Sequence, residues 1–253
     1  MTKFNKIIMN PPYSGNLHLK ILREAMKHVE KEGGEIVNLS PIRWLQDPLA
    51  EYKKGSDWKK FADVMARIES LEVISAKEAT NRFDAAFTMD LGIYTINEKG
   101  GFDRDTIIDP FAKKLAATFV KDFNDGRYGN IRKADESKEY KLYLPKIHGH
   151  IGEKDFTEIT SKRYETALAV KAGYLRKCVS FDSEKERRYF YDSLFTNFYK
   201  YVISHFRTNI NVTEYLDYMP FLPTYKKPWT DADLYEYFDL TPEEIKEIEN
   251  AIR

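Results

Sequence analysis

Four residues near the N-terminus, Asn10-Pro11-Pro12-Tyr13, have the types and spacing for chemistry on an amine. An amino group conjugated to an aromatic ring is a poor nucleophile because its lone pair is delocalised into the ring. Two acceptors aimed at its two N–H bonds would pull the nitrogen toward tetrahedral geometry and free the lone pair. The Asn10 side-chain oxygen can be one acceptor, and the Pro11 carbonyl, held rigid by the Pro-Pro step, can be the other. The four residues therefore suit methyl transfer to an exocyclic amine.

Tyr13 adds a flat aromatic face on which a base extruded from a nucleic acid can stack. The apolar run that precedes the four residues, Phe4 to Met9, predicts a buried strand. The alternative interpretation is an Asn-Pro turn after a strand, with Tyr13 as an ordinary packed aromatic residue. The strand and the segments that follow it favour the methyl-transfer interpretation.

These residues resemble the catalytic motif of the N6-adenine DNA methyltransferases of the amino-methyltransferase group. The resemblance is closest to the methyltransferase part of type IIG restriction–modification proteins and their phage-borne relatives. It covers most of the chain, in the segments Lys6 to Tyr13, Leu17 to Val29, Gly33 to Leu45, Asn81 to Phe83 with Phe87 to Ile96, Pro220 to Pro223, and Trp229 to Tyr235. It implies transfer of a methyl group from S-adenosylmethionine to the N6 amine of adenine in double-stranded DNA.

The resemblance also implies roles for single residues. Asn10 would touch the methionine end of the cofactor as well as the amine. Phe83, expected in a loop before a strand, would stack on the face of the base opposite Tyr13, with Phe87 as the second choice. A core position is the alternative for Phe83, because the chain contains 16 phenylalanines.

The cofactor-binding half of such an enzyme is not recognisable in the sequence. That half uses a glycine-rich turn after a first strand, and only Met1 to Asn5 precede the strand that leads to Asn10. Thr106 to Phe111 echoes the start of a permuted glycine-rich motif, but Ala112 to Leu115 stand where glycines should admit the ligand. Asp109-Pro110 predicts a helix start instead. We therefore expect a split or truncated enzyme, completed by a cofactor-binding subunit or a preceding segment.

Length and composition narrow the class of protein. A chain of 253 residues, 42% hydrophobic and 32% charged, is typical of a globular protein with one large or two modest domains. No apolar run approaches a membrane span or a signal peptide, so a cytoplasmic protein is expected, and the resemblance implies that it is prokaryotic or phage-encoded. The single cysteine, Cys178, excludes an internal disulfide. No metal site is expected, because His148-Gly149-His150 has no further ligands of the usual spacing nearby.

The charge distribution indicates where nucleic acid would bind. The net charge is zero, but bases outnumber acids between Lys154 and Arg207. This bias predicts a surface that contacts DNA phosphates, and a solvated mixed surface is the alternative. The residues expected to bind DNA are Lys162, Arg163, Arg176, Lys177, Arg187 and Arg188.

The predicted fold class is α/β. Part of a Rossmann-like methyltransferase sheet is expected at 1–123, followed at 124–253 by a mixed α/β target-recognition region with a C-terminal helical segment. The turn-rich segment 124–130 marks the boundary. The other expected elements are helices over 16–31, 58–70, 110–123, 182–207, 230–237 and from Pro242, and strands over 36–39, 71–75 and 87–96.

The strand over 4–9, the helix over 16–31 and the strand over 36–39 predict a parallel strand pair. With the cofactor half absent, Lys6 to Met9 should be an edge strand, which a partner chain or a second copy would cover.

Two classes of function stay open. The first is the catalytic and target-recognition part of an adenine methyltransferase, favoured by the intact Asn10-Pro11-Pro12-Tyr13. The second is a catalytically silent DNA-binding or decoy subunit, favoured by the missing glycine-rich turn. Methylation of RNA or of a protein glutamine is a weaker third possibility, because related motifs serve those groups.

Overall fold

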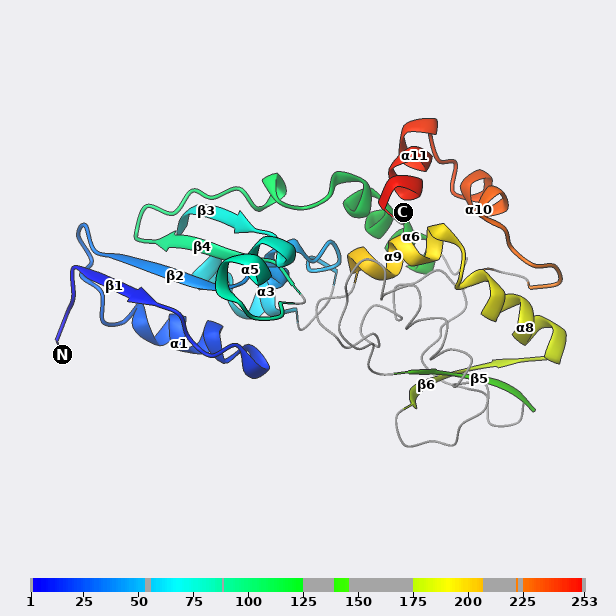
Figure 1. Ribbon diagram of the computed structural model, residues 1–253, viewed down its shortest axis with the longest axis horizontal. Coiled ribbons are helices and arrows are strands. Elements are labelled where there is room, and N and C mark those ends of the chain that lie inside the picture. Colours follow the sequence, from blue (N-terminus) through cyan, green and yellow to red (C-terminus); the bar gives the residue numbers. More distant parts are fainter. Residues whose placement is uncertain are drawn as a thin grey trace. The chain divides into compact units, whose positions relative to one another are not determined.

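A four-stranded mixed sheet forms the centre of the N-terminal part of the chain (Figure 1). Its strands are β1 (Lys6–Met9), β2 (Glu35–Pro41), β3 (Ile68–Ile74) and β4 (Leu91–Ile96), in the order β1-β2-β4-β3. The computed structural model describes residues 2–52, 56–87, 89–124, 139–145, 175–206, 222 and 225–251. Within it the chain divides into two compact units, Met1–Asp109 and Pro110–Arg253.

The α/β class and the parallel strand pair are confirmed. β1 and β2 run parallel, and helix α1 (Leu17–Ala25) connects them. β4 runs antiparallel to both β2 and β3. Among the described strands β1 lies at the edge of the sheet, as predicted. Its exposed and half-buried residues alternate, because successive side chains point to opposite faces.

Helix α1 is shorter than the predicted 16–31. A short 3-10 helix, η1 (Ser14–Asn16), precedes it, and α1 ends at Ala25, with Met26 as its C-cap. Val29 then forms an isolated parallel β-bridge with Phe4, two residues before the start of β1. The chain turns back near Gly34, where a Cβ atom would collide with the Glu30 carbonyl oxygen, so only glycine fits.

The prediction of one helix over 58–70 was wrong. Two short helices, α3 (Asp57–Lys60) and α4 (Ala62–Met65), are separated at Phe61, and β3 begins at Ile68. Ile68 pairs with Ile96 of β4, a contact between residues far apart in sequence. This pairing buries Ile68 completely, which outweighs the local helical preference.

The prediction that Phe83 lies in a loop, followed by a strand from Phe87, was also wrong. Helix α5 (Ala76–Phe83) occupies this segment, and β4 begins only at Leu91. The Ser75 hydroxyl accepts a hydrogen bond from the Glu78 backbone N–H at 3.2 Å, which caps the start of α5. Ser75 and Glu78 have the spacing of a helix-start signal that sequence reasoning overlooked.

The core of the first unit lies on both faces of the sheet. The larger cluster packs α1, α4 and the residues after β2 against one face, and a smaller cluster packs α5 against β3 and β4. The buried members of the smaller cluster are Ile74, Ala79 and Leu91. Those of the larger cluster include Leu19, Leu22, Ile36, Trp44, Val64, Ile68 and Tyr94.

The second unit begins at α6 (Pro110–Asn124), whereas the expected boundary followed this helix. Strands β5 (Tyr140–Pro145) and β6 (Leu175–Phe181) pair antiparallel. The expected helix over 182–207 is two helices, α8 (Glu184–Ser193) and α9 (Asn197–Phe206). Helices α10 (Asp231–Tyr237) and α11 (Pro242–Ala251) follow.

The break between α8 and α9 has a physical cause. Both carboxylate oxygens of Asp231, in α10, accept hydrogen bonds from the backbone N–H groups of Asn197 and Phe198, at 3.1 and 2.9 Å. These bonds satisfy two backbone N–H groups in the first turn of α9, where a helix offers no carbonyl acceptor of its own. The aromatic side chains of α9 form core, since Phe198 stacks on Phe238 at 4.8 Å and is fully buried.

The predicted capping box of α11 is confirmed. Thr241 Oγ1 accepts from the Glu244 backbone N–H at 3.3 Å, and the Glu244 carboxylate accepts from the Thr241 N–H at 2.9 Å. None of the helices in the described ranges combines the length and the apolar character needed to cross a membrane.

Thr241→Ala should lower the free energy of unfolding of the second unit by about 1 kcal/mol, because one donor at the start of α11 loses its acceptor. Urea denaturation followed by circular dichroism measures the change. Thr241→Ser, which keeps the hydroxyl, is the matched control. Equal losses for both variants would show that the cap is not the cause.

Candidate functional site

The segments that follow three strands meet at one edge of the sheet. β1 and β2 are parallel, and β2 and β3 are both antiparallel to β4, so their carboxyl ends point the same way. Asn10, Ile42 and Ser75 follow these strands, and Asp90 precedes β4 at the same edge. Ligands of open α/β sheets bind at this edge, so Asn10 has a position suited to chemistry.

Asp90 ties the segments of this edge together. Its carboxylate accepts hydrogen bonds from the Ala76 backbone N–H at 2.9 Å and from Gln46 Nε2 at 3.1 Å. Its backbone carbonyl accepts from the Ile42 N–H at 3.2 Å. One residue therefore joins the short helix α2 (Arg43–Gln46) and its N-cap Ile42, the start of α5 and the start of β4.

The four predicted catalytic residues form a compact turn. Pro11 is buried, Asn10 and Pro12 are exposed, and Tyr13 is half-buried. The Tyr13 hydroxyl donates a hydrogen bond to Asn10 Oδ1, with 2.6 Å between the two oxygens. Burial raises the pKa of the Tyr13 phenol, so it keeps its proton and stays a donor at neutral pH.

Aromatic side chains gather beside this turn. The Tyr13 ring meets the His18 ring edge to face, with centroids 6.0 Å apart. Tyr13 and Phe87 both pack against the smaller core cluster of Ile74, Ala79 and Leu91. Phe83, at the end of α5, lies edge-on to Phe87 at 5.9 Å and is 44% exposed. The structure thus brings Tyr13 and Phe87 to one cluster, with the more exposed Phe83 next to Phe87.

A buried polar chain lies in the sheet behind this edge, and sequence reasoning missed it. Asn38 Nδ2 donates to Ser40 Oγ at 2.8 Å, and Ser40 Oγ is hydrogen-bonded to the Tyr94 hydroxyl. All three side chains are fully buried. Burial raises the pKa of Tyr94 to about 12, so its phenol is neutral at physiological pH. The sequence signal for this chain was the pair of polar residues Asn38 and Ser40 at alternate positions of an apolar strand.

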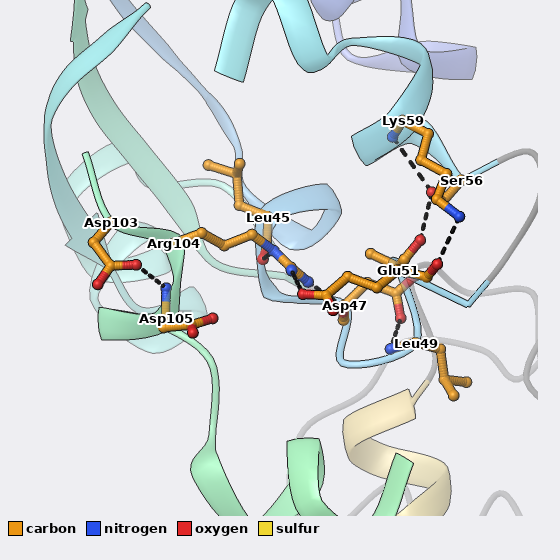
Figure 2. A network of polar contacts seen from close by, with 10 residues as sticks. Leu45, Asp47, Leu49, Glu51, Ser56, Lys59, Asp103, Arg104 and Asp105 are labelled. Carbon is orange, nitrogen blue, oxygen red and sulfur yellow. Dashed lines mark hydrogen bonds and ion pairs between the residues drawn. The ribbon is translucent and has the colours of Figure 1, made fainter. Parts of the chain in front are cut away.

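A buried arginine fixes the segment that follows β2 (Figure 2). Arg104, in the 3-10 helix η2 (Arg104–Thr106), donates to the carbonyl of Leu45 at 2.6 Å and to that of Asp47 at 2.5 Å. Arg104 Nη1 also forms an ion pair with Glu51 Oε1 at 3.3 Å. The guanidinium carbon of Arg104 lies over the Trp58 ring, 5.3 Å from its centroid. Figure 2 shows the continuation of this network, in which Lys59 Nζ donates to the Glu51 carbonyl at 2.6 Å.

No protein-family model, curated protein or solved structure matches this chain.

The predicted DNA-binding residues are only partly described. Lys162 and Arg163 lie outside the described residues, and Arg176 and Lys177 lie on β6. On α8, Arg187 pairs with Glu184 at 3.1 Å and Arg188 pairs with Asp192 at 3.0 Å. These two charges are thus partly neutralised by acids of their own helix.

No group of three or more histidine, cysteine, aspartate or glutamate residues in the described part of the chain could hold a metal ion. His148-Gly149-His150 lies outside that part.

Proposed function

We propose that this chain is the catalytic and target-recognition part of a DNA adenine N6-methyltransferase, with its sheet forming part of a Rossmann-like methyltransferase sheet. The observation that carries the proposal is the exposed Asn10 amide at the carboxyl end of β1, hydrogen-bonded to Tyr13 and beside a group of aromatic rings. An amide acceptor and a stacking surface at one sheet edge are what capture and activation of an extruded base require.

The residues of the turn would act on the adenine amine as acceptors. Asn10 Oδ1 and the Pro11 carbonyl would take the two N–H bonds and favour the tetrahedral nitrogen. S-adenosylmethionine supplies an electrophilic methyl group when bound. The ring of Tyr13, with Phe83 or Phe87 opposite, would hold the base and offset part of the unstacking cost of a few kcal/mol.

We also propose a partner chain, which would bind at the β1 edge of the sheet. Among the described strands β1 pairs only with β2. On the other edge the Phe4 backbone is already bonded to His28 and Glu30, so the backbone groups left for a further strand lie within Lys6–Met9. Ile8 is 76% exposed and Phe4 50% exposed on this part of the chain. A cofactor-binding subunit or a second copy that adds a strand here would satisfy the backbone and cover these side chains.

The DNA surface in this proposal lies in the second unit. Arg188 has a side chain that is 60% exposed and could exchange its Asp192 partner for a phosphate. The other basic residues proposed there are Lys162, Arg163, Arg176, Lys177 and Arg187.

The chain alone should bind S-adenosylmethionine weakly or not at all, because one wall of a pocket gives little affinity. Calorimetric titration of the cofactor into the purified chain measures this. Binding in the micromolar range would show that the chain builds the whole pocket and needs no partner.

The function itself is tested in cells that express the chain together with its genomic neighbours. Mass spectrometry of digested plasmid DNA should detect N6-methyldeoxyadenosine. If no expressed combination yields it and the chain still binds duplex DNA, the silent-subunit alternative replaces the enzyme.

A further inference from the structure

The Asn10 side chain is exposed, and one hydrogen bond restrains it. In the described part of the chain its polar partner is the Tyr13 hydroxyl, at 2.6 Å. An exposed asparagine samples several rotamers and presents either its oxygen or its NH2 group in a given direction. The Tyr13 hydroxyl is therefore the described group in a position to select one orientation of the Asn10 amide.

The Tyr13 hydroxyl is itself held in place by its surroundings. The ring is half-buried against the cluster of Ile74, Ala79 and Leu91, and His18 meets it edge to face. The backbone of Tyr13 is helical, with φ −93° and ψ −18°, at the start of η1. The prolines before it fix two further φ angles. The phenol is thus held in place beside the exposed Asn10 side chain, to which it donates.

We propose that the Tyr13 hydroxyl is a positioning group that orients the Asn10 amide so that its oxygen faces the substrate amine. This inference rests on the proposed function. If the amide were reversed, its NH2 would face the N–H bonds of the amine, and two donors would meet. Donation from the phenol fixes the oxygen on the Tyr13 side, and that oxygen keeps a second lone pair for the amine.

This role is separate from stacking by the Tyr13 ring. A base that stacks on the ring lies beside the hydroxyl and hence beside the oxygen that the hydroxyl holds. Tyr13→Phe keeps the ring and removes only the hydrogen bond, whereas Tyr13→Ala removes both. A comparison of these two variants therefore separates the positioning role of the hydroxyl from the stacking role of the ring.

The first test needs no methyl transfer. Three-bond couplings across the Asn10 χ1 angle and the Asn10 side-chain amide signals are measured by NMR in the purified chain, with the signals assigned by their loss in Asn10→Ala. The wild-type chain should show one rotamer, and Tyr13→Phe should show averaged couplings and shifted amide signals. Tyr52→Phe, which removes the hydroxyl of another partly exposed tyrosine, is the matched control and should leave them unchanged. Unchanged Asn10 couplings in Tyr13→Phe would overturn the inference.

The second test uses the complete enzyme. Tyr13→Phe should lower kcat about tenfold, the value of one lost hydrogen bond, while fluorescence of a 2-aminopurine target base shows capture within twofold of wild type. Tyr13→Ala should lose capture as well. A Tyr13→Phe enzyme with wild-type kcat would contradict the positioning role. Failure of the wild-type complex to methylate would instead remove the proposed function, and the NMR result would still decide whether the hydroxyl orients Asn10.

Discussion

Asn10→Ala should lower kcat for adenine methylation by about a hundredfold to a thousandfold in the assembled enzyme. The substitution removes one of the two acceptors proposed to polarise the amine, while the Pro11 carbonyl and the Tyr13 ring remain. Capture of the extruded base should persist, because stacking does not need the Asn10 amide. Single-turnover transfer of a radiolabelled methyl group to a duplex measures the rate.

The stability of this variant should not change much. Asn10 is exposed, and among the described residues its side chain is bonded to a neighbour in the same turn. The free energy of unfolding should therefore stay within about 0.5 kcal/mol of wild type. Asn5→Ala, another exposed asparagine before β1, is the matched control and should methylate normally. A full methylation rate in Asn10→Ala would remove Asn10 from the catalytic role.

Arg104→Met should lower the free energy of unfolding of the first unit by about 3 kcal/mol. The backbone carbonyls of Leu45 and Asp47 would lose donors at 2.6 and 2.5 Å. Loss of the Glu51 ion pair should add little, because the Glu51 side chain is 47% exposed and water screens the attraction. Urea denaturation followed by tryptophan fluorescence measures the change, since Trp44 and Trp58 lie in this unit.

Two further variants make the comparison specific. Arg104→Lys keeps the charge but loses the planar fork of donors, so an intermediate loss is expected. Arg82→Met removes surface ion pairs to Glu72 and Glu78 and should cost less than about 1 kcal/mol. Equal losses for Arg82→Met and Arg104→Met would show that the buried hydrogen bonds are not what stabilises the unit.

Local signals predicted the parts of the fold that depend on neighbours in sequence. The apolar run before Asn10, the helix that follows and the next strand predicted the parallel pair of β1 and β2. The Thr241–Glu244 spacing predicted the capping box of α11. The capping box is decided within a few residues, and the parallel pair follows from a strand–helix–strand pattern whose elements each show their own side-chain periodicity.

Apart from α5, whose local start signal at Ser75 and Glu78 was overlooked, contacts between distant residues decided the features that sequence reasoning missed. β3 begins at Ile68, inside the predicted helix, because β4 offers it a partner strand. The Ser40–Tyr94 hydrogen bond joins residues 54 apart, and Arg104 reaches a carbonyl 59 residues earlier. A pattern of residue types along the chain carries no direct information on such pairings. At the candidate site, Asn10 and Tyr13 follow from their motif, whereas Asp90 and the Asn38–Ser40–Tyr94 chain appear only when the sheet is assembled.

The strand order has a consequence for how the protein is made. β4 is the last of the four strands to be synthesised, yet it lies between β2 and β3. A nascent chain that ends before Leu91 therefore holds two strands with no partner on the side that β4 will occupy. Such unpaired edges and the long sequence separation of the final contacts make folding slow and expose the intermediate to misassociation. The sheet behind Asn10 can thus form only after the ribosome has released the chain as far as Ile96, and a chaperone that shields β2 and β3 until then would raise the yield of native protein.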